Sequence, residues 1–272
     1  MTTKPVLDSR RIFFAALLLI LFAGTALFAG AKKEEAAPSN PPVTILVAAA
    51  ASLRNAYEQE IIPQFQAKYP WITVEGAFDS SGKLQTQIEQ GLEADVFMSA
   101  AVTQMNNLVK NGHVDAGAVK PLLENKIVLI KTAGASTAVS GFQNITAAKM
   151  IALGDPASVP AGQYAQEIFT SLGIWDAVKA GASLGTNVTE VLNWVGAASA
   201  EVGVVYATDA ASTDKVEIIA EAPAGSLARP VIYPVGQLKA SAHPAEAKLF
   251  IDFLASDAGL AVFRAYGFSP NE

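Results

Sequence analysis

The sequence predicts an α/β protein made of two lobes with a cleft between them. From residue 43 onward, short apolar runs alternate with helical patterns, which is typical of βαβ units and a parallel sheet. Composition changes near Pro121, where the chain is expected to cross to another lobe. Pro223 and Pro230 bracket the segment in which it is expected to return. Ligands of open α/β sheets lie at the carboxyl ends of strands, so several turns should face the cleft.

Composition limits the classes of function. The chain has 272 residues, 51% of them apolar, which is enough for one large or two ordinary globular domains. Its net charge is −6, and because Lys4, Arg10 and Arg11 outweigh Asp8 in the first 31 residues, giving +2, the remainder carries −8. Such an acidic body is a poor nucleic-acid binder. The chain has no cysteine, which excludes disulfides, thiol catalysis, cysteine zinc sites and a lipid-modified cysteine.

The N-terminal segment has the pattern of a secretory signal peptide. Arg10 and Arg11 precede an uncharged run over residues 12–31, and Ala29-Gly30-Ala31 has the small-residue spacing of a cleavage site after Ala31. An uncleaved membrane anchor is the alternative, since 20 uncharged residues can span a bilayer. Both readings place the body outside the cytoplasm. Residues 32–42 are charged and proline-rich, as in a disordered tether.

The first lobe is predicted over residues 43–122 together with 231–272. Pro63 is expected to kink or split its first helix, because proline lacks the N–H that the helix needs there. The expected strands are 43–47, 73–77, 95–99 and 231–238, and the expected helices are 52–69, 83–90, 103–110, 244–255 and 259–266.

The second lobe is predicted over residues 123–230. Asn187 has the residue type preferred at a helix N-cap and should begin one of its helices. The expected strands are 126–131, 150–153, 182–184, 202–206 and 216–220, and the expected helices are 159–172, 175–179 and 187–198.

Catalytic signatures are missing from the sequence. It contains no nucleophile elbow, Walker loop, H-E-x-x-H or dinucleotide motif, and its two histidines have no metal-ligand spacing. Four aspartates near strand ends leave open an exported enzyme with a carboxylate pair, although each also suits a turn or a cap: Asp79, Asp95, Asp155 and Asp209.

Neutral hydrogen-bond donors remain as the candidate chemistry. Ser52, Ser80 and Ser81 occupy strand-to-helix turns, where hydroxyls and free backbone N–H groups make an anion site, although serine is also a common N-cap. The Tyr206 phenol and the turns around Ala161 and Val188 add further donors. Donors without a base favour binding over catalysis.

Several segments, taken together and in order, resemble one known family. They are Val47–Leu53, Phe78–Gly82, Ala94–Ala100, Gly154–Ala165, Gly203–Ala210 and Tyr266–Phe268. This set is similar to the periplasmic molybdate-binding proteins of ABC transporters, the ModA family. The resemblance implies a two-lobed, hinged periplasmic-binding-protein fold of type II.

The resemblance also implies the ligand and its contacts. Molybdate or tungstate would lie in the cleft as an oxyanion, with no side chain ligating the metal, no cofactor and no enzymatic activity. The residues carried over are Ser52, Ser81, Ala161, Val188 and Tyr206. Ser81 is preferred to Ser80 because it matches the second position of the family's serine run. The Asp79 side chain is expected to turn away and cap the helix beginning near Lys83.

The implied role is that of a monomeric solute-binding protein in the periplasm or at the cell exterior. It would capture the anion and deliver it to the membrane permease of a molybdate ABC importer, with no nucleic-acid partner. Two alternatives stay open: a binder of another tetrahedral oxyanion such as sulfate, and the exported enzyme described above.

Overall fold

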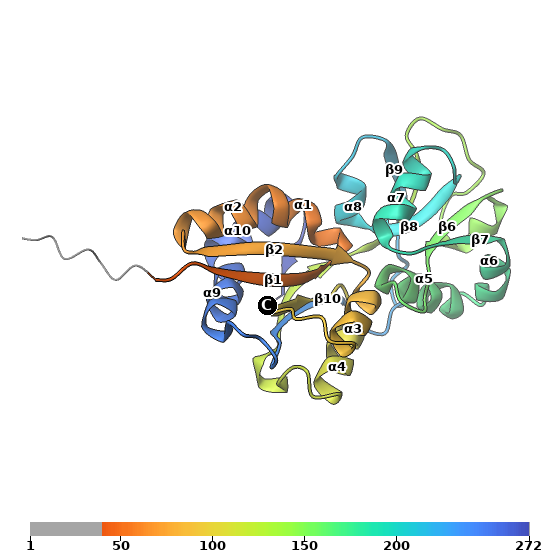
Figure 1. Cartoon of the computed structure of the whole chain (residues 1–272). Coiled ribbons are helices and arrows are strands. Elements are labelled where there is room, and N and C mark those ends of the chain that lie inside the picture. The colour runs from red at the N-terminus through yellow and green to blue at the C-terminus, as the bar shows by residue number, and fades with distance from the viewer. Residues whose placement is uncertain (1–39, 272) are drawn as a thin grey trace, which may run out of the picture. The chain divides into compact units, whose positions relative to one another are not determined.

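Two separate β-sheets organise residues 40–271, which are the residues that the computed structural model describes (Figure 1). The predicted signal peptide, 1–31, and most of the predicted tether, 32–42, lie outside the described residues. Within the described part, no helix has both the length and the apolar character needed to cross a membrane.

The first sheet has six strands in the order β11-β4-β10-β3-β1-β2. Strand β1 pairs in parallel with β2 and β3, whereas β10 runs antiparallel to β3 and β4. The bounds are β1 Val43–Ala50, β2 Ile72–Asp79, β3 Val96–Met98, β4 Lys120–Asn125, β10 Val231–Gln237 and β11 Ser269–Pro270.

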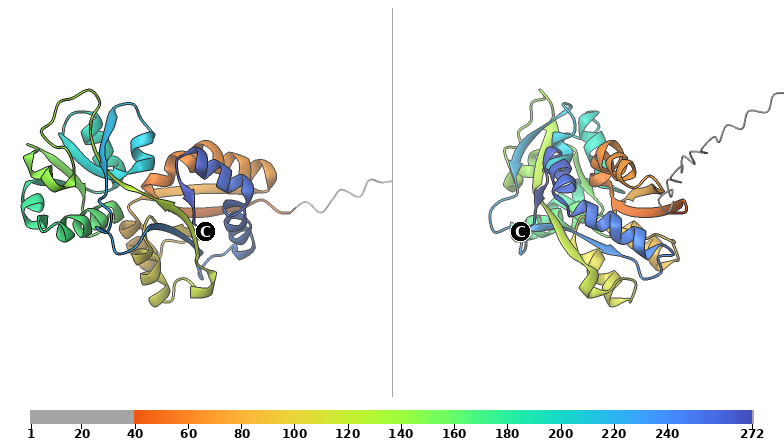
Figure 2. Two further views of the ribbon diagram at one scale, coloured as in Figure 1. Left: turned by 180° about the vertical axis from the view of Figure 1, so that it is seen from behind. Right: turned by 90° about the vertical axis from the view of Figure 1, so that its left-hand side faces the viewer.

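Helices cover both faces of this sheet (Figure 2). Successive side chains of a strand point to opposite faces, so Val47 and Ala49 of β1 join one core cluster and Ala48 joins another. The bounds are α1 Arg54–Ala56, α2 Ile62–Lys68, α9 Pro244–Leu254 and α10 Asp257–Ala265 on the first face, and α3 Ser81–Glu89 and α4 Val102–Lys110 on the other.

Pro63 neither splits nor ends the helix that follows β1. A π-helical turn at Tyr57–Ile61 lies between α1 and α2, so the helical backbone continues from Arg54 to Lys68. Proline cannot donate to the carbonyl four residues earlier, and its ring clashes with that carbonyl. The wider turn just before Pro63 accommodates both effects.

The second sheet has five strands in the order β7-β6-β8-β5-β9. Strand β6 is parallel to β7 and β8, and β5 is antiparallel to β8 and β9. The strands are β5 Ile127–Thr132, β6 Ile151–Gly154, β7 Ala182–Gly185, β8 Val202–Tyr206 and β9 Val216–Glu221.

Helices also flank the second sheet, with α5 and α7 packed on β6 and β8 from opposite sides (Figure 1). Asn187 is the N-cap of α7 and accepts a hydrogen bond from the Glu190 N–H at 3.0 Å, which confirms the predicted cap. The helices are α5 Pro160–Ser171, α6 Trp175–Gly181, α7 Val188–Gly196 and α8 Ala207–Ala211.

The chain first passes between the sheets at Lys126, between β4 and β5, rather than after residue 122 as predicted. Strand β4 is not among the strands predicted from the sequence. Prolines are rare inside sheets except at edges and bulges, and Pro121 pairs with Pro234 where the register of β4 and β10 shifts. That bulge accommodates Pro121 within β4. The return passage lies between β9 and β10.

Candidate functional site

The turns that follow the parallel strands of both sheets enclose one small cavity. Its volume is about 10 Å³, the space of about one water-sized sphere, which suits a small ion better than an organic solute. The lining residues are Ala50, Ala51, Ser52, Asp79, Ser80, Ser81, Ala100, Val159, Pro160, Ala161, Val188 and Tyr206. All five residues predicted to contact the ligand are among them. The structure therefore brings together every predicted donor, and their contact with a ligand stays a prediction.

The first lobe contributes serine hydroxyls. Ser81 is the first residue of α3 and is fully buried, and its Oγ accepts a hydrogen bond from the Ala100 N–H at 3.0 Å. That bond uses an oxygen lone pair and leaves the Ser81 proton available to the cavity. Ser52 lies in the 3-10 turn Ala51–Leu53 after β1, with its Oγ 3.0 Å from the Tyr233 hydroxyl.

Ser80 precedes Ser81, which the family resemblance favours as the ligand contact. Its side chain is buried, yet its Oγ has no hydrogen-bond partner among the residues that the structure describes. Ser80 is the N-cap of α3, but its side chain makes no capping bond. Buried hydroxyls are nearly always paired, so this one is a further candidate donor to the cavity. Its position in the same turn as Ser81 was the signal that could have found it.

The second lobe contributes backbone N–H groups at two helix starts. Ala161 is the second residue of α5, after Pro160, and Val188 is the first residue of α7. An α-helix leaves its first N–H groups without intrahelical partners, and its dipole makes that end partly positive. Because α3 also begins at the cavity, three helices of nine or more residues direct their N-termini toward it. This arrangement is typical of anion sites.

Tyr206 ends β8 and places its phenol across the boundary between the lobes. Its hydroxyl donates to the Ala100 carbonyl of the first lobe at 3.3 Å, and the residue is buried. Burial raises the pKa of Tyr206 well above its ordinary value, and the neighbouring Tyr233 adds to this. Tyr206 therefore remains a protonated donor at neutral pH.

A buried carboxylate holds the backbone of Tyr206. The Oδ2 atom of Asp209 accepts from the Tyr206 N–H at 3.1 Å, as the acidic half of a capping box at the start of α8. Burial raises the pKa of Asp209 from 3.8 to about 7, although the hydrogen bond from Tyr206 opposes the shift.

The cavity has no cationic lining. None of its lining residues, all within the described part of the chain, is lysine, arginine or histidine, and Asp79 is the one acid among them. Asp79 Oδ1 accepts from the Ser80 N–H at 2.7 Å, and Lys83 Nζ lies 3.4 Å from it. The expectation that Asp79 turns away to cap the helix is therefore met only in part. It binds the N–H just before α3, still lines the cavity, and accepts from Asn187 of the other lobe at 3.3 Å.

The lobes approach closely at the rim of the cavity. The Gly82 N–H donates to the Ser158 carbonyl at 2.9 Å, and a Cβ at position 82 would lie 2.5 Å from that oxygen. Glycine is required here because a side chain would collide with the backbone of the other lobe. Farther out, Gln104 Nε2 donates to Gln163 Oε1 at 3.1 Å.

The aspartates proposed as a catalytic pair have structural partners. Asp95 accepts from the Leu46 N–H at 2.8 Å and the Ser241 hydroxyl at 2.6 Å, and Asp155 accepts from the Ala157 N–H at 3.0 Å. Only Asp79 of the four lines the cavity. The described residues include no cluster of three or more histidine, cysteine, aspartate or glutamate side chains able to hold a metal.

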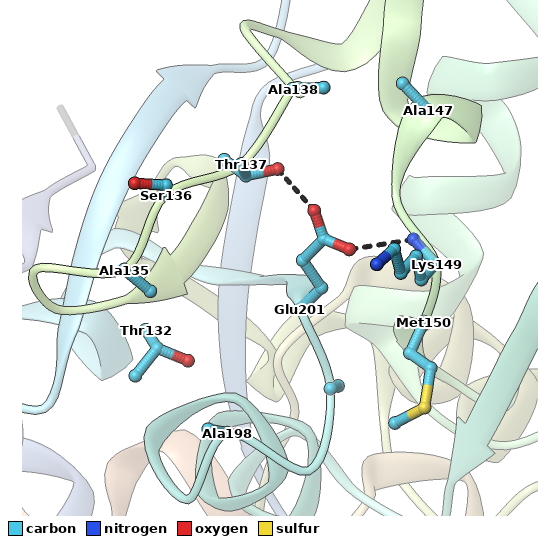
Figure 3. Close-up of a pocket in the computed structure, with 11 residues that line it drawn as sticks. Thr132, Ala135, Ser136, Thr137, Ala138, Ala147, Lys149, Met150, Ala198 and Glu201 are labelled. Atoms are coloured by element: carbon cyan, nitrogen blue, oxygen red, sulfur yellow. Dashed lines mark hydrogen bonds between the residues drawn. The ribbon is translucent and has the colours of Figure 1, made fainter.

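A larger hollow lies entirely on the second lobe (Figure 3). It measures about 580 Å³, and its acid, Glu201, accepts from Thr137 Oγ1 at 2.7 Å and from the Lys149 N–H at 2.8 Å. These hydrogen bonds, led by the one from Thr137, lower the pKa of Glu201. Because one lobe alone lines this hollow, it does not gather donors from both lobes, so size alone does not make it the better site.

Comparison with known proteins identifies the family. The sequence model of one protein family, the bacterial extracellular solute-binding proteins, matches residues 45–269, which are nearly all of the described chain. The chain belongs to this family. Its membership places it among proteins that act outside the cytoplasm.

Individual members of the family are similar over most of their length. The Bacillus subtilis putative ABC transporter substrate-binding lipoprotein YvgL is 40% identical over 80% of this chain and 84% of its own. The Haemophilus influenzae molybdate-binding protein ModA is 38% identical over 80% of this chain and 87% of its own. These solute-binding relatives confirm the predicted resemblance to the ModA family.

A solved structure supports the fold. The substrate-binding domain of a putative molybdenum ABC transporter from Clostridium difficile is 35% identical and superposes with a TM-score of 0.64, covering 85% of this chain and all of that one. The two-lobed solute-binding fold predicted from the sequence is confirmed.

Proposed function

We propose that this protein captures molybdate, and with it tungstate, outside the cytoplasm for an ABC importer. The observation that carries the proposal is the convergence of neutral donors from both lobes on one small cavity. The hydroxyls are those of Ser52, Ser81 and Tyr206, and the backbone N–H groups are those of Ala161 and Val188. A tetrahedral oxyanion accepts hydrogen bonds on all its oxygens and matches such a donor set.

The energetics favour an anion without a charged partner. Each bond to a charged group contributes about 1.5–3 kcal/mol, and helix N-termini add a favourable field. Desolvation of the dianion and ordering of the lobes offset much of this gain. The Tyr206 proton, now bonded to the Ala100 carbonyl, would turn to the anion when it binds.

The transport role follows from the family. The predicted signal peptide would direct export, and the loaded protein would deliver its anion as a monomer to the membrane permease of the importer. We propose no enzymatic activity and no cofactor, because the cavity holds hydrogen-bond donors and one engaged acid rather than a carboxylate pair.

Isothermal titration with molybdate, tungstate, sulfate and phosphate tests the proposal. Molybdate and tungstate should bind in the range from about 1 μM to 1 nM. We propose that sulfate binds more weakly, with anion size as the basis of selection, because all these anions are tetrahedral and meet the same donors. Sulfate binding as tightly as molybdate would replace the proposed ligand by a general tetrahedral dianion. Absence of binding by all four anions would overturn the function itself.

A further inference from the structure

Tyr233 lies behind Ser52, outside the lining of the cavity. It belongs to β10 of the first lobe and is fully buried, and its hydroxyl oxygen is 3.0 Å from Ser52 Oγ. Either hydroxyl can donate in such a pair, so the distance alone does not say where the Ser52 proton points.

The amide of Asn125 sets the direction of this hydrogen bond. Its Oδ1 accepts from the Lys126 N–H at 2.8 Å, which fixes the orientation of the amide group. Its Nδ2 therefore faces Tyr233, 3.2 Å from the phenol oxygen. An amide nitrogen only donates, so the Tyr233 oxygen is an acceptor in this contact.

The Tyr233 proton then has one partner. The Tyr233 hydroxyl lies within hydrogen-bond distance of Ser52 Oγ and of Asn125 Nδ2, and Asn125 already donates to it. The neighbouring Tyr206 hydroxyl donates its own proton to the Ala100 carbonyl. If Ser52 donated as well, the proton of a fully buried phenol would have no acceptor, which is costly. The favoured direction is from Asn125 to Tyr233 and from Tyr233 to Ser52.

We infer that Tyr233 is a positioning residue that occupies a lone pair of the Ser52 oxygen and so directs the Ser52 proton into the cavity. The inference rests on the anion-binding function proposed above. An oxyanion only accepts hydrogen bonds, so a serine lone pair aimed at it would repel it, whereas a serine proton held toward it binds it. The chain of donors makes Ser52 a preset donor before the anion arrives.

The surroundings hold the Tyr233 ring in place. It packs edge-to-face against Tyr206 at 5.5 Å and Phe268 at 5.4 Å between ring centroids. The register shift between β4 and β10 falls directly after Tyr233, and bulges commonly redirect side chains near functional sites. Burial also raises the pKa of Tyr233, so its proton is retained at neutral pH. Because these contacts involve the ring, Tyr233→Phe removes the hydroxyl and leaves the packing.

A double-mutant cycle tests the inference. Molybdate affinity is measured by titration calorimetry for the full chain with Tyr233→Phe, Ser52→Ala and both changes. We expect Tyr233→Phe to raise Kd about tenfold, because the Ser52 proton is no longer preset. The double variant should bind like Ser52→Ala alone, since Tyr233 acts only through Ser52. Tyr57→Phe is the matched control: it removes another buried phenol of the same lobe, bonded to Met98 Sδ at 3.0 Å, and should leave Kd unchanged.

The outcomes separate this inference from the function on which it rests. Wild-type protein that binds molybdate while Tyr233→Phe keeps the same Kd would overturn the inference alone. An equal loss from Tyr233→Phe in the Ser52→Ala background would also overturn it, because a general structural effect is additive. Wild-type protein that does not bind molybdate would overturn both. If Tyr233→Phe does not fold, Asn125→Ala removes the first donor of the chain and should show the same dependence on Ser52.

Discussion

In the proposed site, the two halves of the cavity would recognise an anion by different means. The first lobe presents side-chain hydroxyls at the ends of β1 and β2, whereas the second presents backbone N–H groups at the starts of α5 and α7 and one phenol. A hydroxyl proton can rotate, so its direction depends on neighbouring groups. The neighbour of the Ser52 hydroxyl is the Tyr233 hydroxyl, and that of the Ser81 hydroxyl is the Ala100 N–H. A backbone N–H is fixed by the helix that carries it.

This difference determines how each half responds to mutation. Side-chain donors of the first lobe disappear in an alanine substitution, but the N–H groups of Ala161 and Val188 survive any substitution except proline. The Tyr206 phenol is the exception in the second lobe, because it is a side-chain donor. A buried titrating group, Asp209, accepts a hydrogen bond from the Tyr206 N–H. The second lobe should therefore be the pH-sensitive half.

The largest expected effect is on stability and comes from Asp209. Its pKa is about 7 in the folded protein and 3.8 for the ordinary group, so the folded state favours the protonated carboxyl. The contribution of Asp209 to the free energy of unfolding is therefore fully present below about pH 4, and it is lost as pH rises through about 7. Relative to Asp209→Asn, the unfolding free energy of the wild type should fall by up to about 4 kcal/mol between pH 4 and pH 8.

Urea unfolding of both proteins across this pH range provides the measurement. Asp214→Asn, a change at an exposed carboxylate of the same lobe, is the control and should follow the wild-type profile. A constant difference between wild type and Asp209→Asn would show that the second lobe is no more pH-sensitive than the first.

The next effect tests whether backbone donors bind the anion. Val188→Pro removes the N–H at the first position of α7, where proline is tolerated, and the extended backbone of Asn187, φ −157° and ψ 172°, suits a residue before proline. We expect molybdate affinity to fall by about 2 kcal/mol, the contribution of one bond to a charged group. Val188→Ala removes more apolar volume but keeps the N–H.

Calorimetric titration of the two variants separates the roles of side chain and backbone at this position. Weaker binding by Val188→Pro than by Val188→Ala supports the N–H donor. Equal affinities would mean that the Val188 N–H does not bind the anion.

The sequence predicted the side-chain donors of the site more directly than its backbone donors. Ser52, Ser81 and Tyr206 carry hydroxyls at strand ends, so their chemistry is legible in the residue types. Alanine and valine have no polar side chain, so the sequence indicated only that the turns around Ala161 and Val188 offer backbone N–H groups, and the choice of these two residues as ligand contacts came from the family resemblance. The local signals for those helix starts are Pro160 and Asn187, which mark an N-terminus but not what it faces.

Other features depend on tertiary context that residue types do not encode. The βα alternation predicted nearly every helix and strand, but β4 was missed because the bulge that accommodates Pro121 is made by a strand more than 100 residues later. The choice between Ser80 and Ser81 depends on how α3 is rotated against the other lobe at Gly82 and Ser158.

Ser80 therefore provides the last and smallest test of the first lobe. Its hydroxyl is buried and has no hydrogen-bond partner within residues 40–271, so Ser80→Ala should weaken molybdate binding by about 1 kcal/mol and leave the unfolding free energy of the empty protein unchanged or slightly higher. Ser81→Ala is the matched comparison. It removes the acceptor of the Ala100 N–H, so it should lower both affinity, by about 1.5–3 kcal/mol, and stability. Titration and urea unfolding of both variants measure the two quantities. A loss of about 1 kcal/mol in stability with unchanged affinity would identify Ser80 as an ordinary helix cap, and the first lobe would then bind through Ser52 and Ser81 alone.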